Sequence, residues 1–509
     1  MKFSFDKNLA LKLLSWALIV SLIFILALGK NAIQLDRQGD AAIFEQLLDN
    51  IYQGNGAVSN VFANTQNYID NAYAGLTTEA LLEKNLSLPE PQERNMLAFH
   101  AYYCMYVLAV LKLFFSSSFV LSLVQVVTYV GLLVGIFCFI KGEAKLARWA
   151  FLGVAFVFLN PNWFVGIMGQ FYPDRLFIIG GFLLLYFLHK KIGLANLAIL
   201  AITLSLINER AALISGLVIG AHQVFFYKSQ DFRYSLFRVL IALLLLSYFY
   251  IQKNIVLANV YYAGYMPQSW DHVLVNWSTP GFSKGLWFNI ANNSFLLVLA
   301  CFSPRYALIA LAMLLPNWLG NIGGAEKVGW LTHYHSYYFP VLAFAAAAGL
   351  VNIIRLPAQF NKRYNAKIVS LVFLCLLVSA AYISQKKYNF NGYLITPFSA
   401  MNTYKQSFKA YLSGAKTGLG LRVDAKLLFD QKDIVSTTEL GMALLHDHVK
   451  FSFFPIGLNS ANSVFVPCNY LDGGVDRNVQ KILTDAGFKL IDISSNPIAA
   501  STTYCLLKR

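Results

Sequence analysis

Charged residues are scarce in this chain. Only 13% of its 509 residues are Asp, Glu, Lys or Arg, whereas soluble globular domains carry about a quarter. Apolar residues make up 57%, and they are gathered into long runs with few charges. Aromatic residues reach 15%, and many of them lie where these runs end. This composition excludes an ordinary soluble fold and predicts a helical protein that crosses a membrane several times.

Cysteine is also infrequent, and its spacing matches no zinc or redox motif. Cys468 and Cys505 lie in a polar tail, where they would form a disulfide in an oxidising compartment and remain two thiols otherwise. Both alternatives stand at this point. The other four lie in apolar runs and are expected to be packing residues: Cys104, Cys138, Cys301 and Cys375.

Acidic residues are outnumbered by basic ones, 25 to 40, for a formal net charge of +15. In a soluble protein this excess would suggest nucleic acid as a partner. Here the basic residues stand mostly in short loops between apolar runs, where they orient helices in the membrane. We therefore expect membrane lipid and no nucleic acid as a partner.

The apolar runs predict about eleven transmembrane helices in a membrane domain that covers 1–384. The first run, 13–28, is long for the apolar part of a signal peptide and precedes many others, which favours an uncleaved first helix. The remaining predicted spans are 118–140, 147–160, 175–188, 192–207, 211–227, 234–251, 286–302, 306–318, 335–354 and 367–384.

The segment 98–115 is ambiguous, because its tyrosines and Lys112 suit an interfacial helix as well as a span. The distribution of basic loops decides between them. If 98–115 does not cross, all the basic loops fall on the side of the N-terminus, as the positive-inside rule requires. We therefore expect a cytoplasmic N-terminus, an extracytoplasmic C-terminus, and a first extracytoplasmic loop at 30–117 that carries interfacial helices.

The tail, 385–509, differs in composition and predicts a small soluble α/β domain outside the membrane. Apolar alternation and turn residues delimit its elements. Strands are predicted at 433–437, 449–454, 463–467, 489–493 and 503–507, and helices at 439–446 and 478–486. No catalytic motif stands out in it.

The first extracytoplasmic loop opens with acidic and polar residues. From Ala41 to Tyr52 the apolar residues recur at helical spacing, which predicts an amphipathic helix with Asp40 at its N-cap. A cap is a sufficient structural reason for an aspartate here. A carboxylate at the outer membrane face could equally act as a base.

Three further polar clusters lie at predicted helix ends on the same side. They are Tyr172-Pro173-Asp174-Arg175, Asn208-Glu209-Arg210 and His333-Tyr334-His335. Each acid could simply pair with the arginine beside it, and the tyrosines 334, 337 and 338 fit an aromatic belt. The functional alternative is that the clusters meet in one cavity, where acids act on an acceptor and arginines hold a phosphate. The histidines, His100 among them, could be metal ligands or phosphate donors, although two histidines two residues apart are weak evidence.

These residues resemble the motifs of a family of bacterial polytopic proteins known as domain of unknown function 2079. The opening motif matches Asp40-Ala41-Ala42-Ile43-Phe44-Glu45-Gln46, and a second block matches His100 to Phe115 followed by Leu121 to Gln125. Later blocks correspond to Tyr172-Pro173-Asp174, where the family has histidine in place of Tyr172, and to Asn208-Glu209-Arg210, where the family has Lys-Glu-Asp and only Glu209 is retained. A last block corresponds to Tyr334 to Pro340. That family is related in topology to the GT-C glycosyltransferases.

The resemblance implies a GT-C-like membrane glycosyltransferase in the bacterial inner membrane, with a polyprenyl-phosphate-linked sugar as donor. It implies Asp40, Glu209 and Asp174 as catalytic residues, with Asp40 as the base. A divalent metal is possible but no cofactor is required by the sequence. A transporter or flippase of a lipid-linked substrate, and a non-enzymatic envelope scaffold, are the alternatives. The residues implied in substrate binding are Arg37, Glu45, His100, Tyr172, Arg175, Arg210, His333 and His335.

Overall fold

The computed structural model describes most of the membrane domain and parts of the tail. Residues outside the described ranges include Arg37, His333 and the predicted span 367–384, so the predictions made for them stay untested. The described residues are 7–36, 40–59, 62, 94–144, 147–227, 232–256, 269–320, 334–355, 402, 405–406, 409, 429–430, 433–438, 450–455, 458–468, 479–491 and 504–509.

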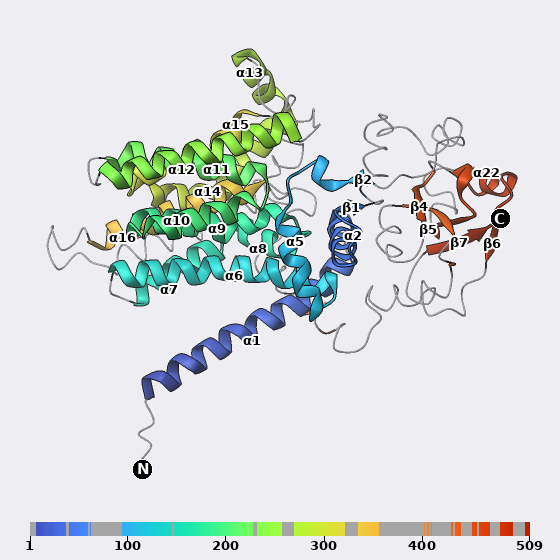
Figure 1. The fold of residues 1–509 in the computed structure, drawn as a ribbon, viewed down its shortest axis with the longest axis horizontal. Coiled ribbons are helices and arrows are strands. Elements are labelled where there is room, and N and C mark those ends of the chain that lie inside the picture. Colours follow the sequence, from blue (N-terminus) through green and yellow to red (C-terminus); the bar gives the residue numbers. More distant parts are fainter. Residues whose placement is uncertain are drawn as a thin grey trace, which may run out of the picture. The chain divides into compact units, whose positions relative to one another are not determined.

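The described part of the membrane domain is built from helices (Figure 1). Three short 3-10 turns lie among them, at Met96–Ala98, Val110–Leu113 and Pro173–Leu176, and a π-turn follows at Gln252–Val256. The helices are α1 (Lys7–Asp36), α2 (Asp40–Tyr52), α5 (Cys104–Ala109), α6 (Ser117–Ala144), α7 (Ala147–Phe158), α8 (Pro161–Met168), α9 (Phe177–Lys190), α10 (Leu194–Ser205), α11 (Glu209–Phe226), α12 (Phe232–Ile251), α13 (Trp270–Ser278), α14 (Pro280–Cys301), α15 (Pro304–Leu319) and α16 (His335–Arg355).

Each predicted span within the described residues coincides with one of these helices. Four stretches are long and apolar enough to cross a membrane: Leu13–Asn31, Ser117–Ala144, Phe232–Val256 and His335–Arg355. A fifth candidate is the pair α7 and α8, whose axes bend by 69° at a short break. The chain is therefore a helical membrane protein. These four or five stretches account for part of the eleven predicted crossings, and the remaining crossings stay a prediction.

The exposure of apolar side chains distinguishes the helices that face lipid from the helix at the centre of the bundle. On α1, Leu13, Trp16 and Leu18 are each about 60% exposed, and α12 exposes Leu243 and Leu244 in the same way. Large apolar side chains exposed along a whole helix are unfavourable in water and stable against lipid. In contrast, α16 is buried along almost its entire length. It packs against α9, α14 and α15, and so positions the residues at its first turn.

The ambiguous segment 98–115 contains only a short helix. Its helical part runs from Cys104 to Leu113, a length of about 15 Å at 1.5 Å per residue. The apolar core of a bilayer is about 30 Å thick. This helix is thus shorter than the apolar core, and the placement of 98–115 on one side of the membrane stays a prediction.

The chain divides into two compact units. The first comprises 1–26, 98–104 and 123–403, and holds most of the helical bundle. The second comprises 27–97, 105–122 and 404–509. Asp40 and Glu45 belong to the second unit, whereas Asp174, Glu209 and His335 belong to the first.

The tail contains a five-stranded mixed sheet with strand order β4-β3-β5-β7-β6. β3 pairs with β4 and β5 in parallel, and β7 pairs with β5 and β6 antiparallel. All five strands and α22 (Val479–Asp485) fall at predicted positions, while the predicted helix 439–446 lies outside the described residues. Cys468 and Cys505 form a disulfide across the β5–β7 pair. The strands are β3 (Ile434–Thr437), β4 (Lys450–Phe453), β5 (Ser463–Pro467), β6 (Lys489–Ile491) and β7 (Tyr504–Lys508), with a short pair β1 (Val58–Ser59) and β2 (Arg94–Asn95) elsewhere in the second unit.

Candidate functional site

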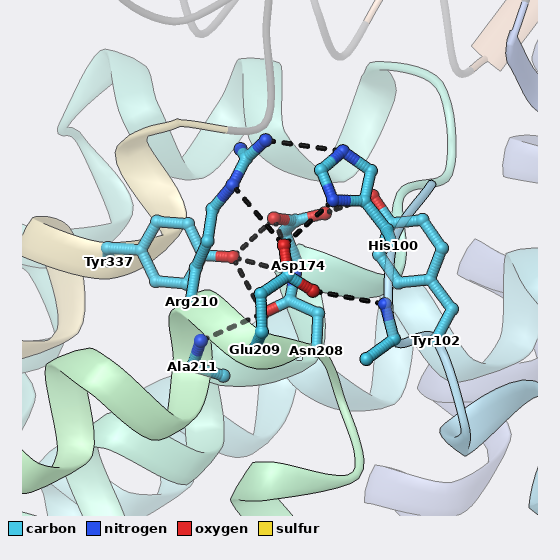
Figure 2. A network of polar contacts seen from close by, with 9 residues as sticks. His100, Tyr102, Asp174, Asn208, Glu209, Arg210, Ala211 and Tyr337 are labelled. Carbon is cyan, nitrogen blue, oxygen red and sulfur yellow. Dashed lines mark hydrogen bonds and ion pairs between the residues drawn. The ribbon is translucent and has the colours of Figure 1, made fainter. Parts of the chain in front are cut away.

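The first turns of three helices bring polar residues together in the first unit. Asp174 lies in the 3-10 turn that leads into α9, Glu209 is the first residue of α11, and Tyr337 is the third residue of α16. Acidic side chains at these positions are favoured by the positive end of the helix dipole. Together with residues from the connection before α5 they form what we call the acid cluster: His100, Tyr102, Asp174, Asn208, Glu209, Arg210 and Tyr337 (Figure 2).

Glu209 is completely buried and is bound by residues more than 100 positions away. Its Oε1 lies 2.8 Å from Nδ1 of His100, and its Oε2 accepts a hydrogen bond from the backbone N–H of Ala101 at 3.0 Å. Arg210 Nε is 4.0 Å from the same carboxylate. The neighbouring pair predicted from the sequence therefore exists, but the histidine makes the closer contact.

The other nitrogen of His100 determines which form the ring takes. Its Nε2 lies 3.2 Å from Nη2 of Arg210. Because a guanidinium only donates hydrogen bonds, Nε2 must be the acceptor. The proton of the ring is then on Nδ1 and points to Glu209. A histidine oriented in this way by a carboxylate, with a lone pair on Nε2, has the arrangement of a general base.

Asp174 is also buried and has a different set of partners. Its Oδ1 accepts from Asn208 Nδ2 at 2.8 Å and from the Tyr337 hydroxyl, and its Oδ2 accepts from the Tyr102 hydroxyl at 3.2 Å. Burial raises the pKa of the Tyr102 phenol well above its ordinary value, and the Asp174 carboxylate adds to the rise. The phenol therefore stays protonated and remains a donor. Asp174 is held by neutral donors, and not by the adjacent Arg175 as one sequence reading proposed.

Asn208 connects this carboxylate to the backbone of α11. Its Oδ1 caps the helix by accepting from the N–H of Ala211 at 2.8 Å, while its Nδ2 donates to Asp174. An asparagine at an N-cap stabilises the helix start by about 1 kcal/mol. Here the same side chain also fixes the orientation of the Asp174 carboxylate.

Arg175 turns away from the acid cluster into a second group of buried residues, the arginine cluster, which is defined by Gln125, Tyr129, Gly166, Arg175 and His335. The guanidinium donates from Nη1 to the carbonyl of Gly166 and, at 3.4 Å, to the Tyr129 hydroxyl. The same hydroxyl lies 2.7 Å from Nε2 of His335. Nε and Nη2 of Arg175 are buried and have no hydrogen-bond partner. A buried guanidinium with two open donors is suited to an anion.

Other predicted site residues are placed elsewhere or are not described. Glu45 is buried on α2, in the second unit. The predicted helix there is confirmed and begins at Asp40, whose side chain lies outside the described residues. Tyr172 is half-buried and precedes the turn that carries Asp174. Arg37 and His333 lie outside the described residues.

The structure adds residues that sequence reasoning missed or misinterpreted. Tyr337 and Tyr338 were assigned to an aromatic belt, but both are buried and hydrogen-bonded. The aromatic pattern of a helix end does not distinguish a ring at the lipid boundary from one that points inward. Tyr102 and Tyr129 gave no signal of their own in the sequence. Gly166 gave none either, although a Cβ there would lie 2.1 Å from the Tyr129 hydroxyl.

Buried asparagines form a third, uncharged group next to Tyr338. Asn162 Nδ2 donates to Asn293 Oδ1 at 2.9 Å, and Asn289 Nδ2 donates to the Tyr338 hydroxyl at 3.1 Å. Both side-chain amide atoms of Asn292 are buried without a partner. Amides offer both donors and acceptors, which suits a neutral polar ligand.

Within the described residues, no group of three or more His, Cys, Asp or Glu side chains is placed to hold a metal ion. Comparison with protein-family models gave no match for this chain, and comparison with curated proteins gave none either.

Proposed function

We propose that this chain is a GT-C-like glycosyltransferase, which transfers a sugar from a polyprenyl-phosphate donor to an acceptor on the outer side of the membrane. The observation that carries the proposal is the buried Glu209–His100 pair, whose second ring nitrogen, Nε2, accepts from Arg210. It combines an oriented base with a cation, Arg210, at one helix start. The resemblance to the bacterial polytopic family supplies the donor class.

In the proposed reaction, Nε2 of His100 takes the proton of the acceptor hydroxyl. The acceptor oxygen forms a bond to the anomeric carbon as the bond from that carbon to the phosphate oxygen breaks. Polyprenyl phosphate leaves with the bonding electrons, and Glu209 stabilises the imidazolium that has formed. For Nε2 to become available, Arg210 has to leave it, and the negative phosphate offers the guanidinium a stronger partner.

Arg175 is the second candidate for binding phosphate. Its two open donors are buried, and an anion in contact with them would offset the cost of the uncompensated charge. The buried group of asparagines, Asn162, Asn289, Asn292 and Asn293, offers amide donors and acceptors to sugar hydroxyls. The proposal thus assigns phosphate recognition to arginines and sugar recognition to neutral amides.

Asp40 remains the base that the resemblance implies. It lies at the start of α2, and the acid cluster lies in the other unit. Asp40 and His100 are therefore alternative candidates for the same proton transfer, and variants of both belong in the first experiment.

The proposed location is the bacterial inner membrane, with about eleven spans, a cytoplasmic N-terminus and an extracytoplasmic tail. The Cys468–Cys505 disulfide supports the position of the tail, because disulfides persist in oxidising compartments and are rare in the cytosol. On this side Glu209 and Asp174 would face the outer leaflet.

Transport of a lipid-linked substrate is the second candidate. It is favoured by a second polar group at the far ends of the same helices, where His189 on α9 lies 3.3 Å from Glu143 on α6. Buried ionisable residues inside a helical bundle often belong to a transport pathway. A transporter would move the intact donor between leaflets without cleaving it.

The test uses the full chain purified in detergent with a panel of polyprenyl-phosphate sugars, alongside Asp40→Ala and His100→Ala. We expect release of polyprenyl phosphate with at least one donor and loss of release in one of the two variants. Binding of a donor without release, followed by its movement between leaflets in vesicles, would favour the transporter. No binding of any donor to a folded sample would refute both.

A further inference from the structure

Two of the helices that begin at the acid cluster, α9 and α16, end in basic residues. α9 runs from Phe177 to Lys190, so its two ends are about 20 Å apart at 1.5 Å per residue. At the far end, Glu143 pairs with Lys190 and with Arg355 at 2.6 Å, which shows that the ends of α6, α9 and α16 meet there. The basic residues on helix ends at this side are Lys141, Lys190, Lys191, Arg233, Arg305 and Arg355.

One arginine at this end is buried between two helices. α12 buries a narrow stripe of four residues, namely Ser235, Arg238, Ala242 and Leu245, in its contact with α11. Arg238 donates from Nη2 to the carbonyl of Leu188 at 3.0 Å, and its guanidinium lies 4.4 Å from the centre of the Tyr234 ring. Among the residues that the structure describes, it pairs with no carboxylate. A buried guanidinium without an anion is costly.

The contact between α11 and α12 also contains buried polar atoms that have no hydrogen-bond partner. Nη1 of Arg238 lies 3.4 Å from Nδ1 of His222 on α11. Because arginine can only donate, this nitrogen is the acceptor, and the ring hydrogen is on Nε2. Nε2 of His222 and Nε of Arg238 are both buried without a partner, as is the hydroxyl of Ser235. Two N–H donors and a hydroxyl beside a positive charge are complementary to an anion.

The position of this contact indicates where an anion would come from. Outside its buried stripe, α12 exposes large apolar side chains to lipid, such as Phe232 and Leu244. Arg238 is six residues into the helix, about 9 Å from its first residue. Tyr234, which is partly exposed, covers the guanidinium. The phosphates of a bilayer lie at the ends of its transmembrane helices, and basic pockets between such helices are known to bind lipid head groups.

We propose that Arg238 and His222 bind the phosphate of an anionic phospholipid from the leaflet at this end of the bundle. The site is separate from the acid cluster and does not depend on the proposed transfer reaction. Binding neutralises the buried guanidinium, and the lipid therefore stabilises the packing of α11 against α12.

The experiment measures thermal unfolding of the full chain in bilayer discs of phosphatidylcholine alone or with phosphatidylglycerol. We compare the wild-type chain, Arg238→Gln, and Arg233→Gln, an exposed arginine on the same helix that serves as the matched control. Phosphatidylglycerol should raise the midpoint by about 2–4 °C in the wild type and in Arg233→Gln. It should leave Arg238→Gln nearly unchanged. An equal rise in all three would overturn the proposal.

Two further measurements distinguish a lipid from a free anion and replace Arg238→Gln if that variant does not fold. Inorganic phosphate added to phosphatidylcholine discs, against chloride at equal ionic strength, tests a free anion as the ligand. A rise that depends on Arg238 and equals that from phosphatidylglycerol would overturn the lipid assignment. If Arg238→Gln does not fold, the same shift in midpoint is measured for His222→Ala and compared with that of the wild type. The absence of any wild-type shift with phosphatidylglycerol would then refute the site.

Discussion

Glu209 Oε1 lies 2.8 Å from His100 Nδ1, although 109 positions of sequence separate the two residues. The contact joins the first residue of α11 to the connection before α5, and Arg210 engages the opposite nitrogen of the ring. A carboxylate, an imidazole and a guanidinium are thus arranged in a row. This row is the basis of the proposed proton transfer, and its neighbours give predictions that can be tested separately.

Replacement of Tyr337 by Phe is expected to destabilise the protein. It removes one hydroxyl that donates to the buried Asp174 carboxylate and that also accepts from Asn208 Nδ2. The cost of an unsatisfied buried group is about 1–3 kcal/mol. Thermal unfolding in detergent measures it. The matched control is Tyr106→Phe, because Tyr106 is 44% exposed. Equal midpoints for the two variants would show that the Tyr337 hydroxyl contributes nothing to stability.

Gly166→Ala is expected to disrupt the arginine cluster. The added Cβ would lie 2.1 Å from the Tyr129 hydroxyl, so the ring must move away from Arg175 and His335. Overpacking of this kind costs about 1–3 kcal/mol. Gly142→Ala on α6 is the control, since nothing lies within 4 Å of its added Cβ. A Gly166→Ala midpoint as high as that of Gly142→Ala would contradict the close packing described here.

The disulfide gives a test of the orientation of the tail. In intact cells, a thiol-alkylating reagent should not label Cys468 or Cys505 before a reducing agent is added. Both should then be labelled. Reduction should also destabilise the tail by about 2–4 kcal/mol, because the bond closes a loop across a sequence separation of 37. Direct labelling of both cysteines before reduction would place the tail in a reducing compartment and contradict the proposed orientation.

Much of the fold could be predicted from the sequence, because helix positions depend on local apolar runs and strand positions on local alternation. The spans predicted at 118–140 and 335–354 correspond to α6 and α16, and the strand predicted at 463–467 is β5. The membrane crossing of the shorter helices does not follow from helix positions alone.

The candidate site was predictable only in part. Asp174, Glu209 and His100 stood out as polar residues at helix ends, but their partners depend on tertiary contacts. Nothing in the sequence near Tyr337 indicates that its hydroxyl meets Asp174, which is 163 positions away. The adjacent Asp174 and Arg175 were expected to pair or to act together. They point into different clusters because consecutive residues in a helical turn project in different directions.

The most direct test of the proposed function is single-turnover transfer from a polyprenyl-phosphate sugar by Glu209→Gln, His100→Gln and the double variant. Because the two residues act as one unit, each single variant should be slower by about 10²–10⁴-fold, and the double variant should be little slower than either. All three should bind the donor as the wild type does. Wild-type rates in folded single variants would contradict the assignment of proton transfer to the Glu209–His100 pair.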